Sequence, residues 1–184
     1  MPRRIITLIV IHCAATANGV RLARVASPGH DAKTAAQVID GWHRERGFHR
    51  TPEWMQRFNP QFGSLGYHYV IDTDGTTEPG RHVDEQGAHA KGHNLRSLGL
   101  CMVGTDRFTI AQWVALKRKV SELRVRYPNA RIAGHRDLSP DLNGDGQVEP
   151  NEWTKICPGF NATDWWLTNS MQPMSGHLCV ETPR

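Results

Sequence analysis

The sequence lacks the features that mark membrane, fibrous and disulfide-stapled proteins. None of its apolar runs approaches the ~18–20 residues that cross a bilayer, and no block of like charge is long enough to form a tail. The four cysteines are 88, 56 and 22 residues apart, which suits neither a stapled small domain nor a CxxC redox pair. No cleavable leader is recognisable. These absences favour a globular protein that stays in a reducing compartment.

What is present fits one domain of ordinary composition. The chain has 184 residues, of which 39% are hydrophobic, and this size and content are typical of one soluble domain. Twenty-two Lys and Arg against 18 Asp and Glu give a net charge of +4, which suits an anionic partner, either nucleic acid or a cell-wall polymer. Ten histidines are the unusual count, and they point to metal or acid–base chemistry.

Hydrophobic periodicity predicts alternating strands and helices. The β-branched run at 5–11 is typical of a central strand buried on both faces. The other expected elements are strands at 66–71, 76–78, 98–103 and 131–133 and helices at 34–46, 109–126 and 162–169. This order predicts an α/β fold with a mixed central β-sheet flanked by α-helices. We expect one catalytic domain over 1–170 and a loosely held C-terminal tail over 171–184.

Two expectations concern local detail. Thr34 and Thr109 each precede Gln by three residues, so each predicts a capping box at the start of a helix. Residues 49–65 have two prolines, three aromatics and no clear period, and we expect an ordered excursion there. In the second long helix, the side chains expected to face the core are Ile110, Trp113, Val114, Val120 and Leu123.

Two histidines follow predicted strands, and this placement points to a site. His12 ends the first strand and His135 ends the last, at the sheet edge where α/β proteins bind ligands. Cys157 lies 22 residues further on. Two imidazoles and a thiolate are good zinc ligands that leave a fourth position open, as catalytic zinc sites do. The alternative is that both histidines are hydrogen-bonded in the core and Cys157 is a small buried hydrophobe.

Six ordered motifs resemble those of a known family. They are HCAAT at 12–16, GYHYVIDTDG at 66–75, GAHAKGHN at 87–94, SLGLCMVG at 97–104, GHRD at 134–137 and KICP at 155–158. Together they resemble the zinc N-acetylmuramoyl-L-alanine amidases shared by phage endolysins and peptidoglycan recognition proteins, over about residues 5–168.

The resemblance implies a set of roles. The zinc ligands map onto His12, His135 and Cys157, and the catalytic Tyr and Lys map onto Tyr67 and Lys155. Residues i and i+2 of an extended segment share a side, so Lys155 is expected to project beside a metal held by Cys157. The implied reaction is hydrolysis of the amide between N-acetylmuramic acid and L-alanine, with one zinc ion activating water, Lys155 stabilising the oxyanion and Tyr67 contacting the water.

The resemblance also implies a partner and a place of action. His89, in the loop that matches the rim of the family's groove, is the candidate substrate-binding residue. The partner is peptidoglycan, and we expect a monomer without nucleic acid or stable membrane association. An endolysin would accumulate in the host cytoplasm and reach the cell wall after a separate membrane-permeabilising protein acts.

Residues 141–152 carry a second metal signal. The segment DLNGDGQVEPNE matches the calcium-loop pattern, with Gly146 at the sharp turn. Its candidate calcium ligands are Asp141, Asn143, Asp145, Gln147 and Glu152. No helix is expected before it, so a polar turn that only resembles the loop is the alternative. If Ca²⁺ binds here, it would stiffen the segment that leads to Lys155 and Cys157.

Other functions are compatible with parts of the pattern. A peptidoglycan recognition module without catalysis would commonly lack the cysteine ligand, and a cytosolic amidase that recycles wall fragments often has Asp in that position. Cys157 therefore favours the endolysin type. A nucleic-acid protein is suggested only by the charge, because the basic residues are scattered and no reading motif is present.

Overall fold

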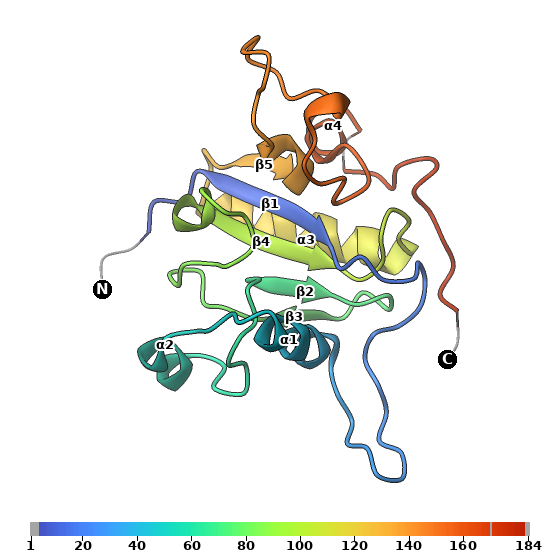
Figure 1. The fold of residues 1–184 in the computed structure, drawn as a ribbon. Coiled ribbons are helices and arrows are strands. Elements are labelled where there is room, and N and C mark those ends of the chain that lie inside the picture. Colours follow the sequence, from blue (N-terminus) through green and yellow to red (C-terminus); the bar gives the residue numbers. More distant parts are fainter. Residues whose placement is uncertain (1–3, 170, 183–184) are drawn as a thin grey trace.

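A five-stranded sheet forms the centre of the fold in the computed structural model, which describes residues 4–169 and 171–182 (Figure 1). The strands are β1 (Leu8–Cys13), β2 (Tyr69–Ile71), β3 (Thr77–Pro79), β4 (Ser97–Met102) and β5 (Arg131–Gly134). Their spatial order is β3-β2-β4-β1-β5, and only β3 is antiparallel to its neighbour. The expected mixed sheet in an α/β fold is confirmed.

Among the described residues, four α-helices and three short 3₁₀ helices surround the sheet. They are α1 (Ala35–Glu45), α2 (Pro52–Arg57), α3 (Ile110–Arg126), α4 (Ala162–Leu167), η1 (Asn94–Arg96), η2 (His135–Leu138) and η3 (Pro150–Glu152). Both predicted capping boxes are formed. The Thr34 and Thr109 side chains each accept from the backbone N–H three residues on, and the Gln37 and Gln112 side chains accept from the backbone N–H of Thr34 and Thr109. The excursion expected over 49–65 contains α2.

The sheet buries its two faces against different helices. Ile9 and Ile11 pack with α3 and α4 in the larger core cluster, while Val70 and Cys101 pack with α1 in a second one. Figure 1 shows α3 running behind β1 and β4. Because side chains alternate along a strand, the His12 side chain lies on the face of the sheet opposite to that of Ile9 and Ile11. The first histidine is therefore presented on the α1 side of the sheet.

The expected core face of α3 needs a correction. Trp113, Val120 and Leu123 are buried as expected, but Ile110 and Val114 are 55% and 61% exposed. At 3.6 residues per turn, Ile110 and Val114 lie more than about 90° around the helix axis from the centre of the buried stripe. The core face therefore follows the Trp113 stripe, and hydrophobicity alone misassigned its neighbours.

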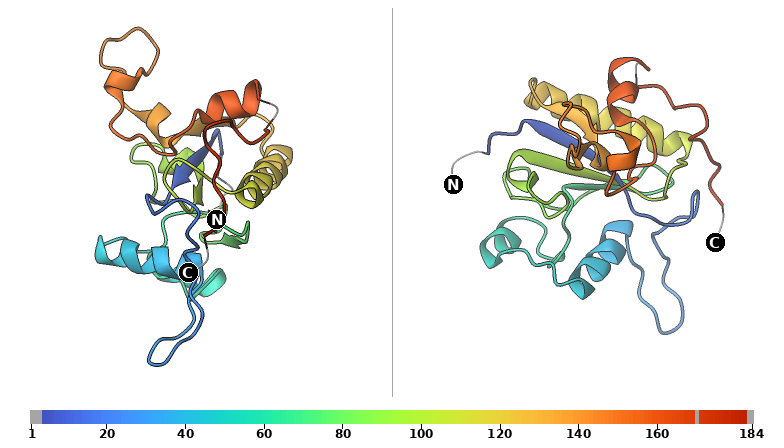
Figure 2. Two further views of the ribbon diagram at one scale, coloured as in Figure 1. Left: turned by 90° about the vertical axis from the view of Figure 1, so that its right-hand side faces the viewer. Right: turned by 45° about the horizontal axis from the view of Figure 1, so that its top comes forward.

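The C-terminal segment is tied to the body of the fold instead of hanging loosely. Leu178 bridges Phe108, Thr182 bridges Val20, and the Thr73 hydroxyl donates to Glu181 Oε1 at 2.9 Å. The expected domain boundary at residue 170 lies outside the described residues. Two loops, within 14–33 and 139–149, stand away from the sheet at opposite ends of the molecule (Figure 2). None of the helices in the described residues is long and apolar enough to cross a membrane.

Candidate active site

Three side chains from distant parts of the chain meet at the end of β1. His12 lies near the end of β1, His135 directly follows β5, and Cys157 lies in the loop that leads to α4. One ligand atom from each lies within 4.8 Å of the others, and the two imidazole centroids are 4.6 Å apart. Within 4–169 and 171–182, this is the one group of His, Cys or carboxylate ligands that converges in this way.

The environment of His12 fits a metal ligand better than a hydrogen-bonded core histidine. Its side chain is fully buried, yet Nδ1 has no hydrogen-bond partner, and buried polar atoms are rarely left so. Burial, and then the nearby His135, hold the pKa of His12 well below its usual range, so the ring is neutral at pH 7 and can bind a cation. An unpartnered, neutral nitrogen beside two other ligands is what a zinc site requires.

Cys157 is fixed to the sheet by backbone contacts. The Arg136 N–H donates to the Cys157 carbonyl at 2.8 Å, and the Cys13 N–H donates to Cys157 Sγ at 3.1 Å. The hydrogen bond with the Cys13 side chain, followed by burial, raises the pKa of the Cys157 thiol. A cation bound by Cys157 must therefore displace the thiol proton, and binding should weaken as pH falls.

His135 and Cys157 line a cavity of about 550 Å³, and both predicted catalytic side chains line it too. The Tyr67 ring lies 5.1 Å from that of His12, and burial raises the Tyr67 pKa well above its usual value, so its hydroxyl stays protonated. Lys155 is exposed and lines the cavity beside Cys157. After burial, the Lys155 charge is the next cause that lowers the pKa of His135. The structure thus brings these residues together with the three ligands.

His89 also lines this cavity, but both its ring nitrogens have partners within the chain. Nδ1 is 3.0 Å from His12 Nε2, and Nε2 is 3.3 Å from Ser97 Oγ. Its expected contact with substrate stays a prediction.

Sequence reasoning missed other residues of the cavity. His43 is buried, lines the cavity and lies 5.2 Å from the Tyr67 ring. Its place four residues after Ile39, on the same face of α1, was an available signal. Arg46 and Phe48 line the same wall, and Lys91 lines the cavity from the His89 loop.

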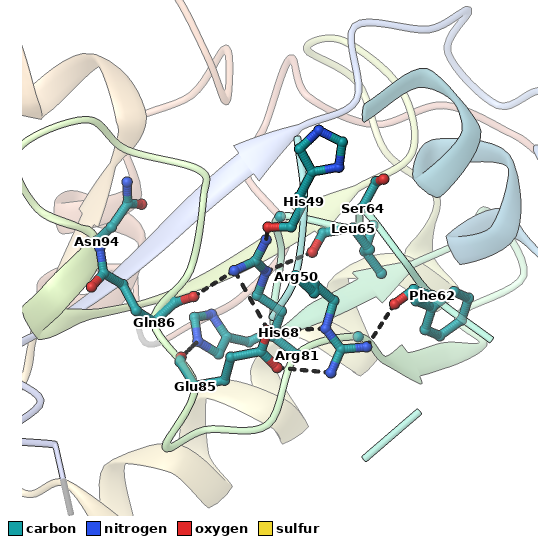
Figure 3. A network of polar contacts seen from close by, with 12 residues as sticks. His49, Arg50, Phe62, Ser64, Leu65, His68, Arg81, Glu85, Gln86 and Asn94 are labelled. Atoms are coloured by element: carbon teal, nitrogen blue, oxygen red, sulfur yellow. Dashed lines mark hydrogen bonds and ion pairs between the residues drawn. The ribbon is translucent and has the colours of Figure 1, made fainter. Parts of the chain in front are cut away.

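A buried polar network holds the segment that carries His89 (Figure 3). Glu85 accepts two hydrogen bonds from Arg50, at 2.9 and 2.8 Å, and lies 3.5 Å from Arg81. The remaining guanidinium donors reach backbone carbonyls, as in Arg50 to Phe62 at 2.8 Å and Arg81 to Leu65 at 2.7 Å. The charges are therefore paired and their hydrogen bonds largely satisfied, which makes this side of the site rigid.

The predicted calcium loop does not gather its carboxylates. Asp141, Asp145 and Glu152 form no converging group of the kind made by His12, His135 and Cys157. Their oxygens accept backbone N–H groups of the loop itself, such as Gly146 on Asp141 at 2.8 Å and Leu142 on Glu152 at 2.7 Å. The structure therefore gives calcium no support beyond the residue spacing.

The α/β fold and the three converging side chains define a candidate metal site at the end of β1. The family model described as N-acetylmuramoyl-L-alanine amidase matches residues 2–160. An endolysin of Klebsiella phage KP32 is 31% identical over 89% of this chain and 87% of its own length. A Haemophilus influenzae protein of undescribed activity is 49% identical over 50% of this chain and 86% of its own length. This chain belongs to the N-acetylmuramoyl-L-alanine amidase family.

Solved structures show the same fold. An N-acetylmuramoyl-L-alanine amidase from Clostridium intestinale superposes with a TM-score of 0.58 at 24% identity, covering 90% of this chain and 85% of the other. At that identity the likeness supports the architecture, and the argument for chemistry rests on the side chains described above.

Proposed function

We propose that His12, His135 and Cys157 hold one catalytic zinc ion in this amidase. The observation that carries the proposal is that one ligand atom from each of the three residues converges, while the buried Nδ1 of His12 has no hydrogen-bond partner. As a family member, the chain is an N-acetylmuramoyl-L-alanine amidase, which hydrolyses the amide between N-acetylmuramic acid and L-alanine of peptidoglycan. Bound zinc supplies a Lewis acid that polarises the carbonyl and lowers the pKa of water.

The neighbouring side chains complete the chemistry. The Lys155 ammonium stabilises the negative charge that develops on the carbonyl oxygen. The Tyr67 hydroxyl, kept protonated by burial, orients the attacking water through a hydrogen bond. Arg46 and Lys91 add positive charge to the cavity walls, which suits a substrate that carries carboxylates.

The biological setting that fits best is that of a phage endolysin acting on the host cell wall. Similarity to phage endolysins over most of the chain supports this setting. We propose that the enzyme works as a monomer, without nucleic acid or stable membrane association. In this scheme it acts on the wall from the host cytoplasm, after a separate protein permeabilises the membrane.

The test is digestion of purified peptidoglycan by the wild type, Cys157→Ser and His135→Ala, with zinc measured in each protein. Wild type should release new L-alanine amino termini without new reducing sugar ends, and both variants should lose zinc and activity together. Retained stoichiometric zinc in Cys157→Ser would remove Cys157 from the ligand set. Binding of wall fragments without hydrolysis would indicate a recognition module, and hydrolysis confined to small soluble fragments would indicate a recycling amidase.

Calcium binding by the 141–152 loop remains a smaller, separate proposal. It rests on the match of Asp141, Asn143, Asp145, Gln147 and Glu152 to the calcium-loop spacing, with Gly146 at the position of the sharp turn. Calorimetric titration of the chelator-treated protein with CaCl₂ tests it, with Asp141→Ala as the control. Absence of binding to the wild type, or equal binding to both proteins, would contradict the proposal.

A further inference from the structure

The hydrogen bond of His12 is the first of a series that runs from the candidate metal ligands through His89 to Ser97. A metal bound at the free Nδ1 requires that nitrogen to be unprotonated, so the ring proton must sit on Nε2. His12 Nε2 then donates to His89 Nδ1 across 3.0 Å. Since His89 Nδ1 accepts, the neutral His89 ring carries its proton on Nε2, which lies 3.3 Å from Ser97 Oγ. Each tautomer in the series is therefore determined by the one before it.

The seat of the His89 ring is built into the sheet. A Cβ at Gly99 in β4 would lie 2.6 Å from His89 Cγ, and one at Gly87 would lie 2.5 Å from His89 Cδ2. Both distances are closer than carbon atoms pack, so both positions must lack a side chain for the ring to occupy this place. Gly99 pairs with Val10 in the register of β1 and β4, two residues from the pair formed by His12.

The backbone around His89 is held as well. The amide groups of His89 and Ala90 both donate to Asn94 Oδ1 at 2.9 Å. On its other side the His89 ring meets the edge of His68, with centroids 5.6 Å apart, and His68 is itself held by the Gly99 N–H at 3.0 Å. The ring therefore has a fixed position from which to orient His12.

We propose that His89 is a positioning residue for the metal site, fixing the tautomer and orientation of His12 so that Nδ1 faces the metal. This inference rests on the proposed zinc site and gives His89 a role other than substrate contact. Hydrogen-bond partners of metal-ligating histidines typically change metal affinity by about 10–100-fold when removed. Loss of His89 should therefore act on zinc affinity first, and Ser97 should support it more weakly.

The test compares His89→Leu with His89→Asn in a chelator-competition measurement of zinc affinity. Leu fills similar space without an acceptor, whereas the Asn Oδ1 can replace His89 Nδ1. We expect the zinc Kd to rise about 10–100-fold in His89→Leu and to return most of the way to wild type in His89→Asn. The visible spectrum of the Co²⁺-substituted protein should change in the Leu variant and resemble wild type in the Asn variant. Ser97→Ala should raise the zinc Kd by less than about tenfold.

Two results would overturn the inference: a wild-type zinc Kd in His89→Leu, or no recovery in His89→Asn. If KM rises at saturating zinc while the zinc Kd stays unchanged, His89 contacts substrate instead. His135→Ala in the same titration separates this inference from the proposed function. Zinc loss in His135→Ala with wild-type affinity in His89→Leu would leave the zinc site standing and remove only the role of His89. Wild-type affinity in His135→Ala would contradict the zinc site itself.

Discussion

The two segments that frame the active site are built in opposite ways. The 80–94 segment, which carries His89, includes the buried side chains of Arg81 and Glu85, and its hydrogen bonds reach distant parts of the chain. The 136–156 segment, which carries Lys155, is exposed at nearly every position from 141 to 151, and the hydrogen bonds described for these positions stay within the segment. We call the 80–94 segment the buried wall of the site, because contacts with the core hold it. We call the 136–156 segment the exposed wall, because it is held mainly at its two ends.

From this difference we expect the 80–94 segment to contribute mainly to stability and the 136–156 segment mainly to catalysis. Substitution of Arg81 or Glu85 in the 80–94 segment should destabilise the fold, because it leaves a charge buried without its partner. Substitutions at the exposed positions 141–151 should leave the fold intact, because water replaces the contacts they remove. A metal bound by His12, His135 and Cys157 would then join the exposed wall to the sheet.

The largest effect should come from Glu85→Gln. Removing the carboxylate that pairs with the buried guanidinium groups of Arg50 and Arg81 should lower the free energy of unfolding by about 3–5 kcal/mol. Asp145→Asn, the same acid-to-amide change in the exposed wall, should alter it by about 0.5 kcal/mol or less. Urea unfolding of both variants, with zinc held constant, measures the two values. Equal losses would remove the contrast between the walls.

Lys155→Met should lower the rate of catalysis and leave stability unchanged. It keeps most of the aliphatic stem but removes the charge that stabilises the oxyanion, so kcat should fall on the order of 10²-fold, with an unchanged zinc Kd and melting temperature. Lys117→Met on α3 is the matched control and should keep wild-type kcat. Peptidoglycan hydrolysis at saturating zinc measures kcat. A melting temperature lowered as much as in Glu85→Gln would mean that the exposed wall also supports the fold.

Lowering the pH should reduce the free energy of unfolding through the buried His68 side chain. Burial lowers the pKa of His68 to about 3, against about 6.5 when unfolded, so the unfolded state binds the proton first as pH falls. The stability that this neutral ring contributes is complete above pH ~6.5 and is lost progressively down to pH ~3. At pH 4 the loss is about 3 kcal/mol.

His68→Asn provides the comparison, because Asn can still accept from the Gly99 N–H. Between pH 7 and pH 4 the free energy of unfolding should fall about 3 kcal/mol less in the variant than in wild type. Urea unfolding at both pH values gives the difference. Identical pH profiles would show that His68 does not titrate in the way its burial implies.

The sequence predicted local structure well wherever a single element contained the signal. The capping boxes at Thr34 and Thr109 were recognisable because both partners lie within three residues. The Glu85 network was not, because Arg50 and Glu85 are 35 residues apart in segments without periodicity. A charged residue in a loop reads as solvated, and only the packing of several loops shows that it is buried.

The candidate site divides in the same way. Strand ends predicted the positions of His12 and His135, and Cys157 was already a candidate third ligand, whereas Tyr67 and Lys155 needed the resemblance to a family. No short-range pattern could have shown that the His89 ring packs against Gly99 of β4, since that contact depends on how the 80–94 segment lies on the sheet. Side chains whose place is set by tertiary packing are those that sequence reasoning assigned least securely.

The smallest expected effect is that of calcium on the exposed wall. If the 141–152 loop binds Ca²⁺ with a Kd of about 10⁻⁴–10⁻³ M, then 1 mM CaCl₂ should stabilise the zinc-loaded protein by about 0.4–1.4 kcal/mol. Thermal unfolding with and without CaCl₂ detects this, with Asp141→Ala as the control and MgCl₂ as the comparison ion. Limited proteolysis should slow at 141–151 and stay unchanged at 80–94. An equal shift in Asp141→Ala would place the calcium effect elsewhere, and the exposed wall would then be held only by its two ends and the metal.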